Sequence, residues 1–169
     1  MKEPFFPQVA KIVSMDISKT YEELKKLLLE NKCRIVEEEP PHKIIVEHGW
    51  VFTTSPTKIE KVVAFVLTPV ESKTRIVAAT SLTTDYKNYI AYSLILNMIF
   101  LIYMGMITYF LSELSSKLSV VVSNVGSELY VLYILFFALI VLTIIEVART
   151  IYAYWKRSSF AENILKLLP

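Results

Sequence analysis

The sequence predicts an α+β protein, in which an antiparallel sheet with one main helix (β-α-β-β-β-β-β) is followed by a transmembrane α-helical hairpin. Two observations lead to this prediction. Charge is uneven, since residues 1–87 hold 13 of the 18 lysines and arginines and 12 of the 16 acidic residues. The apolar content of 54% and the mean hydropathy of +0.47 exceed those of an ordinary soluble protein. At 169 residues, the chain has room for one modest domain and a membrane segment.

The charged half begins with a strand and a helix. Residues 8–17 are rich in β-branched side chains and are bounded by turn formers, which favours a strand. Thr20 and Glu23 have the spacing of a capping box, and an apolar stripe follows it. We therefore expect one helix over residues 21–31. Its stripe consists of Tyr21, Leu24, Leu27 and Leu28.

Further strands complete the predicted sheet. Residues 33–38 and 43–47 flank the turn EPPH and predict a hairpin, and residues 50–54 predict another short strand. Residues 61–70 and 73–83 form the clearest hairpin in the sequence.

Both faces of this last hairpin are apolar, because Val63, Phe65 and Leu67 alternate with Val62, Ala64 and Val66. One helix covers only part of one face. The uncovered apolar surface must meet a ligand, a partner, the C-terminal tail or the membrane surface. The candidate contact residues of the apolar face are Leu24, Leu27, Leu28, Val63, Phe65 and Leu67.

The apolar half contains two predicted spans. Residues 88–112 are 25 consecutive residues without a formal charge, and about 20 apolar residues suffice to cross the hydrocarbon core. Residues 129–145 are 17 uncharged residues, and the second span extends to residue 155. The predicted organisation is a cytoplasmic α+β domain, two transmembrane helices joined by an external loop, and a cytoplasmic amphipathic tail. Their ranges are 1–87, 88–112, 113–128, 129–155 and 156–169.

Flanking charge predicts a cell-membrane protein with both termini in the cytoplasm. Lys87 precedes the first span, and Lys156 and Arg157 follow the second, whereas the connecting segment holds a single base, Lys117. We expect no signal peptide, because the N-terminal residues lack its apolar core. Aromatic residues at the inner ends of both spans resemble a membrane-interface belt. They are Tyr86, Tyr89, Tyr92, Tyr152, Tyr154 and Trp155.

An intramembrane polar cluster is the first candidate site. Asn97 lies nine residues inward from residue 88, and Glu146 lies nine inward from residue 155, so the two share a depth in an antiparallel hairpin. Arg149 follows Glu146 by about one turn. Ionisable groups inside a membrane usually mark function, so the cluster is a candidate lock for the hairpin or for a partner subunit. The alternative is a Glu146–Arg149 pair that extends to the interface and has no further role.

The tail predicts a short amphipathic helix. Ser159 and Glu162 have capping-box spacing. Its expected apolar side consists of Phe160, Ile164, Leu167 and Leu168. This side would lie either on the inner membrane surface or against the soluble domain.

Little in the sequence indicates chemistry. A net charge of +2 with interspersed acids and bases disfavours nucleic-acid binding. Cys33, the single cysteine, is expected to be a small buried residue. His42 and His48 lie near glutamates but without a recognised metal-ligand spacing. We therefore expect a non-enzyme with no catalytic, metal-binding or cofactor-binding residues. Abundant Ile, Val, Lys and Glu are compatible with a thermophilic source.

The charged half resembles a known superfamily. The helix beginning TYEELKKLL, the run of antiparallel strands and the phrase LTPVESKTRI are similar to the SRPBCC superfamily, the helix-grip fold of START-type and polyketide-cyclase-like domains. The resemblance covers residues 8–84 and implies binding of a lipid or another apolar ligand. In the family a long C-terminal helix follows the last strand and covers the cavity. This chain departs from that pattern, because the first predicted span begins at the same position.

Three functions remain open at this stage. The first is a non-catalytic subunit or scaffold of a membrane assembly, associating with itself or with another membrane protein. The second is a membrane-tethered module that binds a lipid or other apolar ligand. The third is a component of an oligomeric channel or transporter, because two spans cannot enclose a pore alone.

Overall fold

The computed structural model describes residues 8–53, 55, 58–117 and 125–169, with the side chains of 115–117 and 125–129 left aside. The chain forms two compact units. One consists of Met1–Lys87 together with Ile151–Pro169, and the other of Asn88–Thr150. The first unit therefore combines the N-terminal domain with the C-terminal tail.

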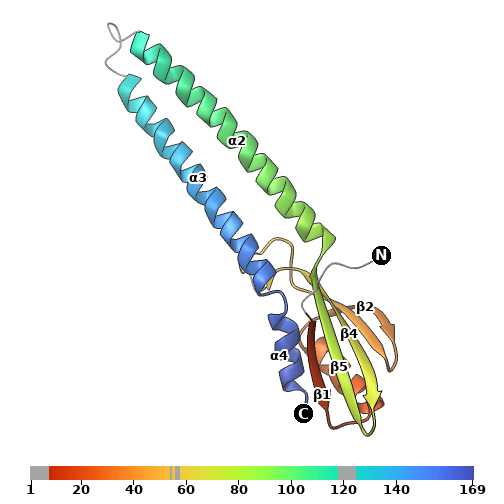
Figure 1. The fold of residues 1–169 in the computed structure, drawn as a ribbon. Helices are drawn as coiled ribbons and strands as arrows, with labels where there is room; N and C mark the ends of the chain where they lie inside the picture. The colour runs from red at the N-terminus through yellow and green to blue at the C-terminus, as the bar shows by residue number, and fades with distance from the viewer. Residues whose placement is uncertain (1–7, 54, 56–57, 118–124) are drawn as a thin grey trace. The chain divides into compact units, whose positions relative to one another are not determined.

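The first unit contains a five-stranded antiparallel sheet in the order β1-β5-β4-β3-β2 (Figure 1). The predicted α+β class is confirmed. The bounds are β1 (Gln8–Val13), β2 (Arg34–Glu39), β3 (Lys43–His48), β4 (Lys61–Val70) and β5 (Lys73–Leu82). The longest pairing joins β4 to β5, from Lys61 opposite Leu82 to Val70 opposite Lys73.

The additional strand expected at residues 50–54, between β3 and β4, is not present in the part of that segment that the structure describes, so this prediction was wrong. Trp50 pairs with Ile59 in an isolated parallel bridge, and the chain bends at residues 51–52; residue 54 lies outside the described residues. The cause is Gly49, whose φ of +104° turns the chain out of β3. A Cβ there would lie 2.5 Å from the carbonyl oxygens of Lys58 and Ile59, so only glycine fits.

The main helix, α1 (Ile17–Glu30), begins earlier than predicted. Asp16 is its N-cap and accepts a hydrogen bond from the Lys19 N–H at 3.0 Å. Thr20, expected as the cap, is fully buried in the first turn, and its hydroxyl donates to the Asp16 carbonyl at 2.8 Å. The capping-box pattern therefore placed the start of this helix about one turn too late.

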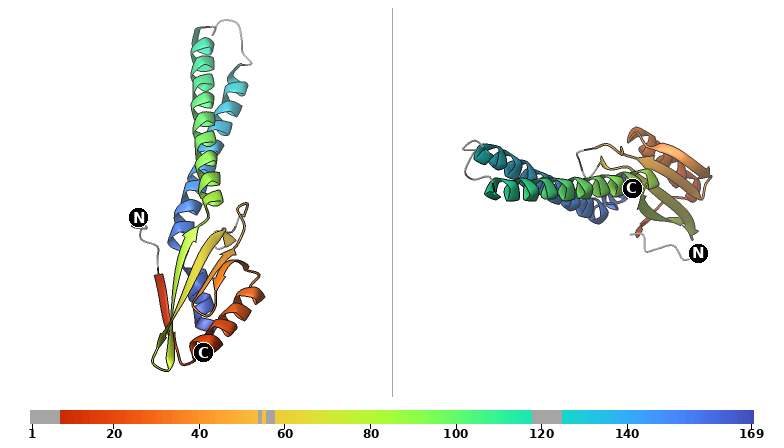
Figure 2. Two further views of the ribbon diagram at one scale, coloured as in Figure 1. Left: turned by 90° about the vertical axis from the view of Figure 1, so that its right-hand side faces the viewer. Right: turned by 90° about the horizontal axis from the view of Figure 1, so that it is seen from above.

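The tail helix, α4 (Ser159–Leu167), packs against the sheet and α1 (Figure 2). The sequence left open whether this helix lies on the membrane surface or against the domain, and in the structure it lies against the domain. Lys11 of β1 adds a tie, because its ammonium donates to the Leu168 carbonyl at 2.5 Å. The buried residues of this segment belong to the same core as α1 and the sheet. They are Ala161, Ile164, Leu165 and Leu168.

Two details of this helix differ from expectation. Leu167 is 61% exposed and Leu165 is 2% exposed, the reverse of the expected apolar side. The buried positions 161, 164, 165 and 168 follow helical spacing, which leaves residue 167 outside the stripe. The Glu162 carboxylate also accepts its hydrogen bond from the Ser158 hydroxyl, at 2.9 Å, rather than from Ser159.

The candidate apolar-face residues line this core. Five of the six are buried and Leu27 is partly buried, so their partners are the domain's own helices and strands. The buried residues of neighbouring strands lie opposite one another and therefore point to the same face of the sheet. This is the face that α1 and α4 cover. The strand members of the core are Val13, Ile44, Val46, Val63, Phe65, Leu67, Ile76 and Ala78.

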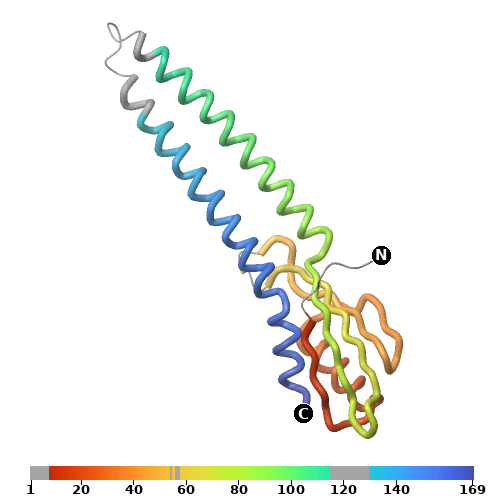
Figure 3. The backbone as a smooth tube through the Cα atoms, viewed as in Figure 1, coloured from red at the N-terminus to blue at the C-terminus, as the bar shows by residue number. Residues whose placement is uncertain are grey.

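The second unit consists of parts of two long helices, α2 (Thr84–Lys117) and α3 (Val125–Trp155). Both are long and apolar enough to cross a membrane, and most of the large apolar side chains described in them are exposed. Each helix extends into the range predicted as the external loop, 113–128, part of which lies outside the described residues. Figure 3 follows the chain from β5 into α2 through one intervening residue, Thr83.

The first prediction compares Leu165→Ala with Leu167→Ala. The buried substitution leaves a cavity under α4 and should lower the free energy of unfolding of the domain by about 2–5 kcal/mol, whereas the exposed one should change it by less than about 0.5 kcal/mol. Chemical denaturation of the full chain in detergent, followed by tyrosine and tryptophan fluorescence, measures both. Equal effects would contradict the packing of α4 into the core.

Candidate functional site

The sheet has a second face, opposite α1 and α4, which we call the outer face. Its centre is apolar and consists of isoleucine, valine and alanine side chains that are partly exposed in the described structure. The strand register places Ala64 between Ile45 and Ala79, and Val66 between Lys43 and Val77. With Val62, these apolar residues define the outer face: Ile45, Val62, Ala64, Val66, Val77 and Ala79.

Ion pairs border this apolar centre on the side of β2. The Arg34 guanidinium pairs with Glu47, its Nε donating to Glu47 Oε2 at 3.0 Å. The Lys43 ammonium lies 2.5 Å from Glu37 and 3.5 Å from Glu39. These exposed pairs add little to stability, but they give the β2 side of the apolar centre a border of mixed charge.

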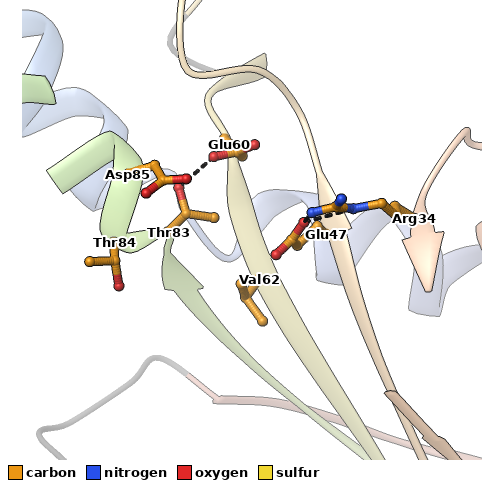
Figure 4. A pocket seen from close by; sticks show the side chains of 7 residues that line it. All are labelled: Arg34, Glu47, Glu60, Val62, Thr83, Thr84 and Asp85. Atoms are coloured by element: carbon orange, nitrogen blue, oxygen red, sulfur yellow. Dashed lines mark hydrogen bonds and ion pairs between the residues drawn. The ribbon is translucent and has the colours of Figure 1, made fainter. Parts of the chain in front are cut away.

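A polar cleft of about 220 Å³ lies at the end of the outer face where β5 ends (Figure 4). The Thr83 hydroxyl donates to Glu60 Oε2 at 2.7 Å and accepts from the buried backbone N–H of Tyr86 at 3.3 Å. Thr83 thereby joins the loop before β4 to the first turn of α2. Among the described residues, no group of His, Cys, Asp and Glu is arranged to hold a metal ion. The lining residues are Arg34, Glu47, Glu60, Val62, Thr83, Thr84 and Asp85.

Three titratable side chains meet inside the domain on the core side of the sheet. Lys61, opposite His48 in the β3–β4 register, is only 3% exposed. Cys33 Sγ lies 3.8 Å from His48 Nδ1. Phe160 of α4 stacks on the His48 ring, with centroids 4.1 Å apart, and the Lys61 ammonium lies 5.6 Å from the Phe160 centroid. The sequence indicated none of this grouping, because it depends on strand register and on α4.

Burial dominates the electrostatics of these groups. It raises the pKa of the Cys33 thiol to about 11, despite the nearby Lys61 charge. Burial lowers the pKa of the Lys61 ammonium to about 8, and burial with the Lys61 charge lowers the pKa of His48. A thiol with a raised pKa is a poor nucleophile at neutral pH, so this geometry does not describe an activated cysteine.

The second unit contains the polar site of the helical hairpin. The Asn97 side-chain amide of α2 donates to Glu146 Oε2 of α3 at 2.7 Å. The Ser93 hydroxyl donates to Glu146 Oε1 at 2.5 Å. Ser93 was missed from the sequence, although it lies one helical turn before Asn97 and therefore on the same side of the helix. Arg149 follows Glu146 by one turn in α3, and its role stays a prediction.

Comparisons with known proteins give no family. No family description matches the chain, and no curated protein matches it. The similar solved structures include protein MLL2253 from Mesorhizobium loti, at 16% identity and a TM-score of 0.37, and CalU16 from Micromonospora echinospora, at 12% identity and a TM-score of 0.35. The first match covers 49% of this chain and 82% of that protein, the second 54% and 66%. Likenesses of this size support no assignment.

The second prediction concerns Lys61. Burial lowers the pKa of Lys61 in the folded domain to about 8, whereas in the unfolded chain it has the ordinary lysine value. Between these two values the unfolded chain binds more protons than the folded domain, so the free energy of unfolding should rise as the pH increases through this range. Between pH 7 and 8.5 the gain should be about 0.5–1 kcal/mol. Burial raises the pKa of the Cys33 thiol to about 11, so above the ordinary thiol value this group should lower the free energy of unfolding as the pH rises.

Thermal unfolding across this pH range provides the measurement. Lys61→Met should be more stable than the parent at pH 7 and should lose the pH-dependent gain. Lys58→Met removes an exposed lysine and should retain it. A parallel pH profile for Lys61→Met and Lys58→Met would exclude the assignment to Lys61.

The third prediction concerns the interhelical hydrogen bond. A double-mutant cycle of Asn97→Leu and Glu146→Gln should give a coupling energy of about 0.5–1.5 kcal/mol in detergent-mediated unfolding of the full chain. The control cycle combines Asn97→Leu with Thr143→Val, because the Thr143 hydroxyl donates to the Leu139 carbonyl of its own helix at 2.8 Å. Its coupling should be near zero, and equal couplings in the two cycles would count against a specific Asn97–Glu146 interaction.

Proposed function

We propose that this is a two-pass membrane protein whose α+β domain is a cytoplasmic interaction module, acting as a non-catalytic subunit or scaffold of a membrane assembly. The observation that carries the proposal is the outer face. Its apolar centre with a rim of ion pairs resembles the anatomy of a protein interface. The other face of the sheet is already covered by α1 and α4. The outer face is therefore the surface of the sheet that a partner protein would contact.

Several observations support the membrane location. Both long helices have sufficient length and apolar content to span a bilayer, and their exposed side chains suit a lipid environment. Bases flank the two ends that connect to the domain, which by the positive-inside rule places both termini in the cytoplasm.

We further propose that the domain is related to the SRPBCC fold, with the membrane hairpin inserted before its C-terminal helix. The family's C-terminal helix is missing directly after the last strand, and α4 supplies a helix on the core face of the sheet instead. Its Ile164, Leu165 and Leu168 side chains pack on the sheet beside α1 and belong to the same core. This packing favours an interaction module over the ligand-binding alternative.

The hairpin argues against the channel alternative in the same way. A channel role would need Glu146 or Asn97 to face a water-filled axis. Instead, Ser93 and Asn97 of the same chain donate to the two carboxylate oxygens of Glu146. This arrangement favours a lock between the two spans, with an apolar outer surface left for a second copy or another membrane protein.

The fourth prediction tests the function by native mass spectrometry of the full-length protein, gently extracted from its own membranes. We expect self-assembly or a co-purifying protein, with no stoichiometric small molecule. Val66→Glu places a charge in the outer face and should abolish this association, because burying an unpaired carboxylate at an interface is costly.

Leu29→Glu is the matched control. Leu29 is an exposed apolar residue of α1, and α1 lies on the opposite side of the sheet, so this variant should retain the association. A single copy that carries a stoichiometric apolar molecule would instead favour the ligand-binding module. Retention of the partner by both variants would remove the outer face as its contact.

A further inference from the structure

Two aromatic residues after β3 are the most exposed large apolar side chains that the structure describes. Trp50 is 76% exposed and Phe52 is 83% exposed, more than any described apolar residue of α2 or α3. Neither belongs to the core, the outer face or the polar cleft described above. Exposure of two neighbouring large aromatics in a charged domain indicates an interaction surface.

The exposure of Trp50 is imposed by a fixed backbone. Gly49 turns the chain out of β3 through its positive φ. The Trp50 N–H then donates to the Lys58 carbonyl at 3.0 Å, and the Glu60 N–H donates to the Trp50 carbonyl at 3.2 Å. Ile59, which pairs with Trp50, is buried. The base of the loop is therefore tied on both sides, and the indole is held on the outside.

The same base is linked to the start of α2. Glu60 accepts the Thr83 hydroxyl at 2.7 Å, and its backbone carbonyl accepts the Thr83 N–H at 3.5 Å. Thr83 immediately precedes α2, and the uncharged run of that helix begins five residues later, at Asn88. Five helical residues rise only about 8 Å. The loop that carries Trp50 is thus bonded to the chain within one or two turns of the expected membrane surface.

We propose that Trp50 and Phe52 insert into the headgroup region of the inner leaflet and anchor the domain to the lipid surface. The inference rests on the proposed function, in which α2 and α3 cross the membrane. Lipid is the occupant that the observations favour, because tryptophan concentrates at the membrane–water interface, where its apolar ring and its N–H are both accommodated. Two further aromatic side chains, Tyr89 and Tyr92, are exposed at the start of α2.

Tryptophan fluorescence provides a direct test, because the chain has two tryptophans. Trp155→Phe leaves Trp50 as the reporter in the full-length protein, reconstituted into phosphatidylcholine vesicles that contain a minority of phosphatidylglycerol. Lipids brominated near the carbonyl end of the acyl chain should quench about half of the Trp50 emission, as expected for a ring at the interface. Iodide on both sides of the bilayer should quench it weakly.

Two controls separate the possible failures. Trp50→Phe leaves Trp155 at the end of α3, and quenching of Trp155 by brominated lipid tests the membrane location itself. Val70→Trp, with both native tryptophans replaced by Phe, reports the opposite end of β4, some 30 Å away, and should be quenched by iodide and not by lipid.

Trp50 that is open to iodide and unaffected by lipid, while Trp155 is quenched by lipid, would overturn the inference alone. Trp50 that is shielded from both quenchers would also overturn it, because protein would then cover the loop. Loss of lipid quenching at Trp155 as well would overturn the membrane location and with it the proposed function.

Discussion

The packing of α4 into the sheet is the constraint on which the first unit depends. Ile164, Leu165 and Leu168 fill the space beside α1, and their burial contributes about 1.5–3 kcal/mol for each side chain. These residues follow the helical hairpin in sequence, yet they complete a core that begins at β1. The domain is therefore discontinuous, and it cannot close its core until the whole hairpin has been made.

This discontinuity places the two chain connections under a common restraint. One residue separates β5 from α2, and three residues separate α3 from α4. Thr83 is buried and hydrogen-bonded to Glu60, so the end of β5 is tied to the loop before β4. The chain therefore leaves the sheet and returns to the domain through short connecting segments.

The sequence predicted the sheet, the helix and both long apolar helices, because each has a periodicity or a length that does not depend on distant residues. The depth argument also named Asn97 and Glu146, which the structure brings within hydrogen-bonding distance. It missed Ser93 and the grouping of Cys33, His48 and Lys61, since these depend on strand register and on α4. The strand expected at residues 50–54 was wrong. Its β-branched and aromatic residues favour a strand, but the positive φ of the preceding Gly49 ends β3 and turns the chain away from the sheet.

The polar groups enclosed by each unit have different consequences. Lys61 is buried near a thiol and aromatic rings, and its lowered pKa is a cost that the surrounding apolar packing offsets. Glu146 instead receives two donors from the neighbouring helix, so its polarity specifies how α2 and α3 pair. In an apolar environment such a pairing defines register more than it adds stability, because exposed leucines and isoleucines could pack equally well in many registers. One carboxylate with two donors is thus sufficient to select a single arrangement of two otherwise unspecific helices.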